Sequence, residues 1–429
     1  MRADRAYVLA ARLAQGAADP DFRTLVEQID GMPLVPADAT RLYTDGADAT
    51  AAVARAIESA RHEVLVETYI LRDDRIGWAL VDLLRAAVAR GVRCHVLADA
   101  VGSWGARRAF WRALADAGVV TRRFHPLSLD LVNSFRRDHR KLVIVDRAVA
   151  FTGGMNIGAE YGSSLRSERR TRWWRRWRSL GATRPDAYRD TLARFDGPVA
   201  SQLAAVFAEG WHRAGGAPMP ALEQVAWSDD AGAPAVPLPL REVHTESNAA
   251  CLILDARPGR GQPETIAVLA AALGAARARA WITTPYFAPP DAALTLLADA
   301  VQRGVDVRLL LPGMSDVPVM RWAARGAYAR LLASGVRLFE YQPAVLHAKT
   351  LVVDDALSLV GSANLDYRSF WFNAECTVLV FDAVLAGAMA QSFRDDLADA
   401  HEVTADAWHR VPWWWKVMAW GARQCRWVL

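Results

Sequence analysis

One short pattern, H-x-K-x4-D, occurs twice in this chain, at residues 139–146 and at residues 347–354. The copies lie 208 residues apart, and Gly-Gly-Met-Asn at 153–156 aligns with Gly-Ser-Ala-Asn at 361–364 at the same offset. This shared register indicates an internal duplication, so the chain is expected to fold as two equivalent halves. The residues of the pattern are His139, Lys141 and Asp146 in the first copy and His347, Lys349 and Asp354 in the second.

The residues that follow each lysine predict a strand, a turn and a return strand. Short β-branched runs at 142–145 and 351–353 lead into Asp-Arg and Asp-Asp turns. Return strands are expected at 148–151 and 357–360, and glycine follows each of them. Because side chains alternate along a strand, the histidine and lysine of one copy share a face. A buried lysine beside a histidine predicts a shared anionic ligand, since an unpaired charge is costly to bury.

Two such pairs facing each other would surround one phosphate with two imidazoles and two ammonium groups. One imidazole can attack phosphorus, while the other protonates the leaving oxygen and later deprotonates the incoming hydroxyl. Histidine suits both roles because its pKa lies close to neutral pH. The lysines, together with Asn156 and Asn364, would stabilise charge on the non-bridging oxygens. This scheme needs no metal and no other cofactor.

The doubled motif resembles the signature of the phospholipase D superfamily, and the resemblance extends from about Leu42 to about Ala400. It implies an α/β fold of two pseudo-symmetric lobes, each a mixed β-sheet flanked by helices, with the active site at the lobe interface. It also implies a phosphohistidine intermediate and no metal cofactor. Further segments are similar to bacterial cardiolipin synthases of the type that lacks N-terminal membrane spans. These segments are 42–46, 67–70 with Gly77, 154–161, 284–287, and 364–369 with Asn373 and Glu375.

The resemblance also implies an acidic partner for each histidine. Within each lobe, one carboxylate is expected to orient the histidine of that lobe, Asp190 in the first and Glu375 in the second. The superfamily usually has tryptophan where Tyr188 stands and histidine where Leu192 stands. These departures leave the acid of the first lobe in place.

Two further pairs of aligned residues belong to the predicted site. Gly154 and Ser362 stand at equivalent positions beside the asparagines and are expected to support the phosphate. Asp146 and Asp354 complete the doubled motif and are therefore included in the predicted catalytic set. Both aspartates lie in turns, so we interpret their main role as bracing the loop rather than direct chemistry.

The order of patterns along the chain predicts five parts. They are an N-terminal helical segment at 1–40, a first lobe at 41–213, a proline-rich linker at 214–240, a second lobe at 241–402 and a C-terminal segment at 403–429. In both lobes, β and α segments alternate with short glycine-bounded links, which favours a mixed sheet covered by helices. The expected helices include 50–61, 78–90 and 106–117 in the first lobe and 265–277 and 292–303 in the second.

Composition limits the alternatives. The chain has 429 residues, 52% of them hydrophobic, and a net charge of only +4, so it is not a polyanion binder over its whole surface. Four isolated cysteines fit a reducing compartment and exclude a disulfide framework. No run of about 18 apolar residues occurs, and neither a membrane span nor a signal peptide is expected.

An arginine-rich insertion at 163–187 departs from the scaffold. It holds eight arginines, two acids and three tryptophans, Trp173, Trp174 and Trp177. Indoles at headgroup depth with guanidinium groups on phosphates suit an anionic bilayer, which is the interpretation we favour. Nucleic-acid binding by stacking and phosphate neutralisation, and a solvated loop without a ligand, are the alternatives.

The C-terminal segment is the second candidate for membrane contact. Residues 408–429 hold six tryptophans, four cations and no acid. Past Pro412, the apolar residues fall on one helical stripe, with Lys416, Arg423 and Arg426 on another side. This pattern predicts an interfacial amphipathic helix in which Trp413, Trp414 and Trp420 contact lipid. The alternative is a helix that packs its tryptophans onto the lobes.

Together these features predict a peripheral enzyme on the cytoplasmic side of the bacterial inner membrane. The hypothesis is a cardiolipin synthase that transfers a phosphatidyl group to phosphatidylglycerol, with phosphatidylglycerol or phosphatidylethanolamine as donor. The sequence names no protein partner, and no nucleic acid is expected. The alternatives are a phospholipase D that transfers to water, a nucleic-acid phosphodiesterase, and a membrane adaptor without activity.

Overall fold

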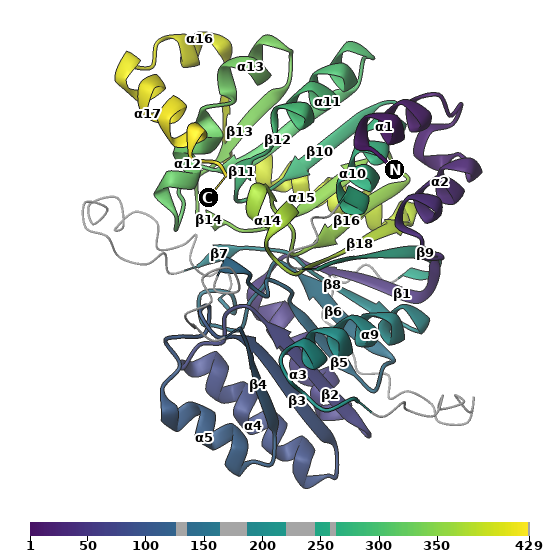
Figure 1. Ribbon diagram of the computed structural model, residues 1–429, viewed down its shortest axis with the longest axis vertical. Helices are drawn as coiled ribbons and strands as arrows, with labels where there is room; N and C mark the ends of the chain where they lie inside the picture. The colour runs from purple at the N-terminus through teal and green to yellow at the C-terminus, as the bar shows by residue number, and fades with distance from the viewer. Residues whose placement is uncertain (126–134, 164–186, 220–244, 258–262, 428–429) are drawn as a thin grey trace.

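A single mixed β-sheet runs through both lobes of the protein. The computed structural model describes residues 1–125, 135–163, 187–219, 245–257 and 263–427. Within these ranges the fifteen strands of the sheet follow the order β19-β13-β12-β10-β15-β16-β18-β9-β1-β8-β6-β5-β2-β3-β4. The central strands β1 and β9 are antiparallel and join the lobes (Figure 1). The α/β fold predicted from the doubled motif is confirmed, with the sheets of the two lobes fused edge to edge.

The strands of the two lobes correspond one to one when counted outward from the centre. The inner strands β8, β6 and β5 of the first lobe match β18, β16 and β15 of the second, and all pair antiparallel with their neighbours. The outer strands β2, β3 and β4 match β10, β12 and β13, and each trio is parallel. The predicted equivalence of the two halves therefore extends to every strand of the sheet except β19, which has no counterpart in the first lobe.

The first lobe contains seven of these strands, together with four described helices that pack against them. Its strands are β1 (Val35–Tyr43), β2 (Glu63–Thr68), β3 (Arg93–Asp99), β4 (Val120–Phe124), β5 (Leu142–Val145), β6 (Val149–Gly153) and β8 (Leu192–Asp196). Its described helices are α3 (Gly46–Ser59), α4 (Arg75–Ala89), α5 (Arg108–Asp116) and α9 (Pro198–Arg213). The short strand β7 (Tyr188–Arg189) lies outside the sheet.

The second lobe repeats this arrangement and adds an edge strand. Its strands in the sheet are β9 (Thr245–Ala256), β10 (Arg279–Thr283), β12 (Asp306–Pro312), β13 (Arg337–Tyr341), β15 (Thr350–Val353), β16 (Leu357–Gly361), β18 (Glu375–Phe381) and β19 (Ala400–Val403). Its described helices are α10 (Pro263–Ala275), α11 (Asp291–Gln302), α12 (Pro318–Arg325), α13 (Tyr328–Ala333), α14 (Tyr367–Trp371) and α15 (Ala383–Leu397). Short strands β11 (Phe287–Ala288), β14 (Val345–Leu346) and β17 (Leu365–Asp366) lie outside the sheet.

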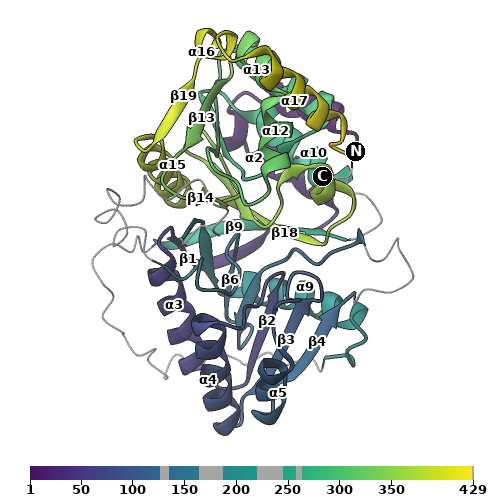
Figure 2. The same ribbon diagram turned by 90° about the vertical axis from the view of Figure 1, so that its left-hand side faces the viewer.

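Helices cover both faces of the sheet, which gives three layers (Figure 2). One apolar core lies under α9 and α15 and is shared by the two lobes, from Leu65 to Phe393. The opposite face has a separate core in each lobe, one under α3, α4 and α5 and the other under α10, α11 and α13. The shared core and the continuous sheet hold the two lobes in a fixed relation.

Several helices begin earlier than the apolar pattern predicted. Helix α3 begins at Gly46 because the Asp45 side chain accepts hydrogen bonds from the backbone N–H groups of Ala47 and Asp48. Asp74 caps α4 in the same way through the N–H groups of Ile76 and Gly77. Polar first turns carry no apolar periodicity, so the pattern alone placed both starts too late.

The N-terminal segment belongs to the second lobe rather than standing alone. Helices α1 (Ala3–Ala11) and α2 (Pro20–Asp30), with a 3-10 turn at Gly16–Ala18, pack on α10 (Figure 1). Gly274 lets α1 approach, since a Cβ there would lie 2.3 Å from the Tyr7 carbonyl oxygen. The expected boundary at residue 40 is too late, because β1 already begins at Val35 and pairs with β9.

The two motif aspartates close tight turns at the ends of β5 and β15 that lie away from the motif lysines. Asp146 has a φ of 52° and its carboxylate accepts hydrogen bonds from the N–H groups of three residues, 61–63. Asp354 has a φ of 51° and binds the N–H groups of residues 277–279 in the same way. Each aspartate thus ties its turn to the start of a neighbouring strand, which is a structural task.

Two helices follow the second lobe at the C-terminus, α16 (Ala405–His409) and α17 (Trp413–Gln424). Helix α17 packs on α12 through Ala419 and Arg423. In the described part of the chain, no helix has both the length and the apolar composition that a bilayer span requires.

Candidate active site

The two motif histidines lie on segments that are exchanged between the lobes. Strand β14, which leads to His347, pairs in parallel with β7 of the first lobe, and the His347 N–H donates to the Arg189 carbonyl at 2.7 Å. In the same way, the His139 N–H donates to the Ala374 carbonyl of the second lobe at 2.9 Å. Each histidine is therefore fixed by backbone hydrogen bonds to the lobe that it does not belong to.

The acidic partners follow the same exchange. Nδ1 of His139 lies 3.0 Å from Oε2 of Glu375, and Nδ1 of His347 lies 2.7 Å from Oδ2 of Asp190. The expectation that each acid orients the histidine of its own lobe was wrong. The sequence aligned the residues correctly, but the exchanged strands place each histidine beside the acid of the other half.

The Glu375 carboxylate is held by hydroxyl and amide donors. It accepts hydrogen bonds from Ser362 Oγ at 2.6 Å, from Ser369 Oγ at 2.8 Å and from Asn373 Nδ2 at 3.2 Å. Burial opposes its ionisation, but His139, Lys141 and Ser362 hold the pKa of Glu375 below its usual value. Ser362, which was expected to support the phosphate, thus orients the acid.

Gly154 performs the equivalent task in the first lobe by leaving space. A Cβ at this position would lie 2.0 Å from Oδ1 of Asp190, so any larger residue would displace that carboxylate. The Asp190 carboxylate also accepts a hydrogen bond from the Thr191 N–H at 2.7 Å. Gly154 and Ser362 therefore act on the acids, one by being small and the other by donating a hydrogen bond.

The two motif lysines are buried close to each other. Nζ of Lys141 donates to the His139 carbonyl at 2.5 Å, and Nζ of Lys349 donates to the His347 carbonyl. Burial and repulsion from Lys349 lower the pKa of Lys141 to about 7, and burial lowers the pKa of Lys349 to about 8 against the attraction of Asp190. Two neighbouring ammonium groups with lowered pKa values form a site that a bound anion would stabilise.

Both histidines are neutral in this environment. Burial lowers the pKa of His139 to about 4, although Glu375 opposes the shift. Burial and the charge of Lys349 also lower the pKa of His347, against the attraction of Asp190. Nδ1 of His139 faces two acceptors, the Glu375 carboxylate and the Ser362 carbonyl at 3.2 Å. Its proton therefore resides on Nδ1, which leaves the lone pair of Nε2 free to react.

The two asparagines differ in how far their side chains are engaged. Asn156 accepts a hydrogen bond from the Ile70 N–H at 3.1 Å and donates to the Tyr161 hydroxyl at 2.9 Å. Asn364 is 3% exposed, and its side-chain oxygen has no hydrogen-bond partner. A buried amide with an unpaired oxygen is costly, which indicates that Asn364 is poised for a ligand.

Several aromatic side chains that the sequence did not single out surround the histidines. The Tyr69 ring lies 5.1 Å from the His139 ring and 5.7 Å from Nζ of Lys141. Tyr161, Tyr188 and Tyr286 surround His347, with ring centroids 5.6 to 6.3 Å away. A signal for Tyr69 and Tyr286 was present, because they lie in the segments 67–70 and 284–287 that carry the family resemblance.

The structure thus places the remaining predicted residues in three groups. His139, Lys141, His347 and Lys349 converge with Asp190 and Glu375 at the lobe interface. Asp146 and Asp354 bind backbone N–H groups at the remote ends of their strands. Trp173, Trp174 and Trp177, with most of the linker at 214–240, lie outside the described residues.

Comparison with known proteins agrees with this geometry. The family model described as "Cardiolipin synthase, PLD-like domain" matches residues 53–166 and 269–397, one stretch in each lobe. The chain is 36% identical over 380 residues to "Cardiolipin synthase A" of Pseudomonas entomophila, which covers 87% of this chain and 72% of that protein. It is 31% identical to "Cardiolipin synthase 2" of Bacillus anthracis over 86% of this chain and 67% of that protein.

A solved structure supports the fold. The crystal structure of phosphatidylserine synthase from Haemophilus influenzae superposes with a TM-score of 0.66 and covers 95% of this chain and all of that one. The two sequences are only 14% identical, so this likeness concerns the fold alone.

The exchanged acid pairs predict which histidine responds to which substitution. In the Glu375→Gln variant, the neutral amide no longer stabilises a positively charged imidazole. The ¹⁵N chemical shifts and the pKa of His139 should therefore change. Those of His347 should stay as they are, and the Asp190→Asn variant should show the reverse. Histidine-selective ¹⁵N NMR measures both, and a response of the histidine in the same lobe would contradict the exchange.

The lowered lysine pKa values predict pH-dependent anion binding. Sulfate keeps a constant charge from pH 6 to 9, and it needs the ammonium forms of Lys141 and Lys349. Because these forms are lost as pH rises through about 7 and about 8, sulfate affinity should be highest near pH 6, decline as pH approaches 7, and fall about tenfold or more from pH 8 to 9. Isothermal titration calorimetry measures this slope. The Lys349→Met variant should bind more weakly with a shallower slope, and a constant affinity up to pH 9 would contradict the prediction.

Proposed function

Because this chain belongs to the cardiolipin synthase family with phospholipase D-like domains, we propose that it is a phosphatidyltransferase that makes cardiolipin. It transfers the phosphatidyl group of one phospholipid to a hydroxyl of phosphatidylglycerol. The observation that carries the proposal is the pair of exchanged histidine–carboxylate contacts around two buried lysines. This arrangement provides a nucleophile, an acid–base group and an anion site at one place.

His139 is the proposed nucleophile. Glu375 and the Ser362 carbonyl hold its proton on Nδ1, so that Nε2 can attack the phosphorus of the donor lipid. A bond forms between Nε2 and phosphorus, and the bond from phosphorus to the oxygen of the donor headgroup breaks. When phosphatidylglycerol is the donor, the headgroup leaves as glycerol once it has received a proton.

His347 is the proposed acid and base. An anionic substrate beside it raises the pKa of its imidazole, and Asp190 stabilises the imidazolium that forms. Its Nε2 gives a proton to the departing oxygen. In the second half of the reaction, the same nitrogen takes the proton from the acceptor hydroxyl. That hydroxyl attacks phosphorus, and the bond to Nε2 of His139 breaks, which restores the enzyme.

The lysines and asparagines stabilise the charge that the reaction creates. Lys141 and Lys349 approach the site from opposite lobes, so their ammonium groups can bind the two non-bridging oxygens. The side-chain amide N–H group of the buried Asn364 is a further candidate donor for such a contact. Two buried ammonium groups stabilise the negative charge of a phosphodiester more strongly than they would in water, because the site is shielded from solvent.

The orientation of α17 supports a peripheral membrane attachment. Its apolar side chains point outward, with Trp413, Trp414 and Trp420 exposed by 75%, 47% and 64%. The arginine side of the helix faces the protein instead, because Arg423 and Arg426 both bind Asp291 on α11. These two arginines lie on a different side from the exposed tryptophans, as the sequence indicated, but they are paired with the protein. An outward stripe of indoles suits the headgroup region of a bilayer.

We place the enzyme on the cytoplasmic side of the bacterial inner membrane. All four cysteines of the chain are free thiols, and Cys94, Cys251 and Cys376 are buried. Thiols of this kind suit a reducing compartment. Phosphatidylethanolamine is a second candidate donor, and its use is one outcome of the experiment below.

Lipid product analysis tests the proposed reaction. Purified protein with phosphatidylglycerol vesicles should form cardiolipin and release glycerol, and the His139→Ala variant should lose at least about 10³-fold in rate because it lacks the nucleophile. Mass spectrometry of the lipids measures both. The Asp355→Ala variant is the control, since this residue is exposed in a turn remote from the lysines.

The products also separate the alternatives. Phosphatidic acid without cardiolipin would replace the proposal with a hydrolase, in which water takes the place of the acceptor hydroxyl. Cardiolipin formed faster when phosphatidylethanolamine is added would identify that lipid as the donor. No lipid product from the unmutated protein would overturn the proposed function.

The outward tryptophans of α17 predict a membrane-binding defect. The triple variant Trp413→Ala, Trp414→Ala, Trp420→Ala should bind phosphatidylglycerol vesicles at least tenfold more weakly, since each indole removed from water contributes about 1–3 kcal/mol. Vesicle co-sedimentation measures the affinity. Val384→Ser removes an exposed apolar group from α15 and serves as the control. Unchanged binding of the triple variant would show that these indoles do not contact lipid.

A further inference from the structure

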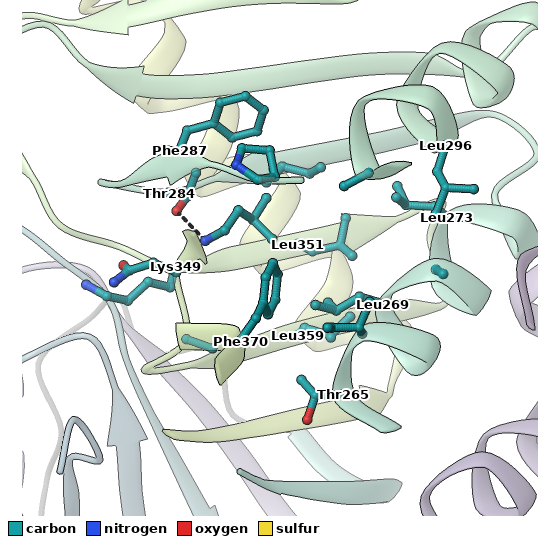
Figure 3. A pocket seen from close by; sticks show the side chains of 18 of the residues that line it. Thr265, Leu269, Leu273, Thr284, Phe287, Leu296, Lys349, Leu351, Leu359 and Phe370 are labelled. Atoms are coloured by element: carbon teal, nitrogen blue, oxygen red, sulfur yellow. Dashed lines mark hydrogen bonds between the residues drawn. The ribbon is translucent and has the colours of Figure 1, made fainter. Parts of the chain in front are cut away.

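An elongated apolar cavity lies in the second lobe between the sheet and helices α10 and α11. Its volume is about 130 Å³. Its wall is largely apolar and includes Leu269, Leu273, Leu296, Leu351, Leu359 and Phe370. Figure 3 shows them projecting into one continuous space from the helices and from the strands β15 and β16.

One end of the cavity is formed by the active site itself. Lys349 and Asn364 line this end. In Figure 3 the amine of Lys349 points away from Leu351 and Leu359, toward the lobe interface. Asn364, whose buried oxygen has no partner, is the polar group at the boundary. The site that binds the phosphate and the apolar cavity are therefore separated by one lysine and one amide.

The other end opens between the two helices. Leu269 on α10 and Leu296 on α11 are only partly buried, and Ala292 and Ala293 beside them are small. Helix α10 is apolar around most of its circumference, because one side packs on α1 and α2 and another faces this cavity. A surface helix that packed only on the sheet would carry a narrower apolar stripe.

Helix α14 links the cavity to the outward tryptophans. Phe370 lines the cavity, and its ring lies 5.9 Å from the ring of the exposed Trp371. Tyr367 on the same turn contacts both Trp371 and Trp427, with centroids 4.8 and 4.1 Å apart. Apolar surface thus continues from the cavity through α14 to the exposed Trp427, which follows α17.

We propose that this cavity binds the first part of one acyl chain of the phospholipid whose phosphate lies between the two histidines. The inference rests on the proposed function and adds to it a subsite in the second lobe. A phospholipid has its phosphate and its chains joined through a short glycerol unit, which matches a polar end at Lys349 and Asn364 followed by hydrocarbon walls. Apart from these two residues, the polar groups of the lining are threonine hydroxyls, so no charged ligand is accommodated.

The occupant is one chain rather than two, because the space is narrow. The cavity is small for a ligand site, since pockets for drug-sized molecules usually measure about 300–1,000 Å³. The second chain of the same lipid would then stay in the bilayer. A methylene that moves from water into the cavity is stabilised by leaving water, whereas a methylene that comes from the bilayer gains little. The subsite therefore orients a lipid more than it tightens binding.

Filling the cavity tests the inference through chain-length selectivity. Ala293 lines the mouth on α11, so the Ala293→Phe variant narrows it. The ratio of kcat/KM for dioleoyl over dihexanoyl phosphatidylglycerol in mixed micelles should fall at least tenfold. Ala298→Phe places the same ring on the same helix, at a partly buried position outside the cavity lining, and should leave the ratio unchanged. Thermal unfolding of both variants checks that they fold alike.

A binding measurement separates this subsite from the catalytic proposal. Native mass spectrometry of protein from detergent should show one retained dioleoyl phosphatidylglycerol, and Ala293→Phe should reduce its occupancy while Ala298→Phe does not. This result would support the subsite even if no cardiolipin formed, in which case only the proposed function would fail. An unchanged selectivity ratio together with unchanged lipid retention in Ala293→Phe would overturn the subsite.

Discussion

The exchange of histidine segments between the lobes is the contact on which the active site depends. His139 is positioned by the backbone of Ala374 and the carboxylate of Glu375, both from the second lobe. The strand before His347 pairs with β7 of the first lobe, and Asp190 faces its imidazole. Neither half contains a complete histidine–acid pair alone. The continuous sheet through β1 and β9, and the core shared by α9 and α15, provide the rigidity that such an exchange needs.

Charge balance lowers the cost of burying the ionisable groups of this site. Two carboxylates face two lysines with weakened pKa values, while both imidazoles stay neutral. The two carboxylates and the two ammonium groups cancel when both lysines are protonated, which reduces the cost of burying the four charges. A phosphodiester restores the ammonium forms, so substrate binding and proton uptake are coupled. Recognition of the phosphate and preparation of the acid–base group are then one event.

The sequence predicted the strands around both motifs and the identity of the residues that converge. It succeeded there because a duplication in register marks equivalent positions, and β5 and β15 lie where the β-branched runs do. It could not show which acid faces which histidine, since an offset between copies does not describe contacts between lobes. It also could not show that Arg423 of α17 is engaged by the protein, because its partner Asp291 is distant in sequence. Tyr188 illustrates the same limit, as its contact with His347 crosses the interface.

The ion pairs of Asp291 with Arg423 and Arg426 fix the C-terminal helix to the second lobe. Asp291 begins α11, one wall of the apolar cavity, so the outward indoles and that wall belong to one rigid piece. A C-terminal segment attached through a flexible linker would leave the orientation of the catalytic lobes relative to a bilayer undefined. On the proposed membrane surface, a helix held by these ion pairs would set the height and the tilt of the whole enzyme. The ion pairs of Asp291, far from the two histidines, would then determine the angle at which a lipid enters the active site.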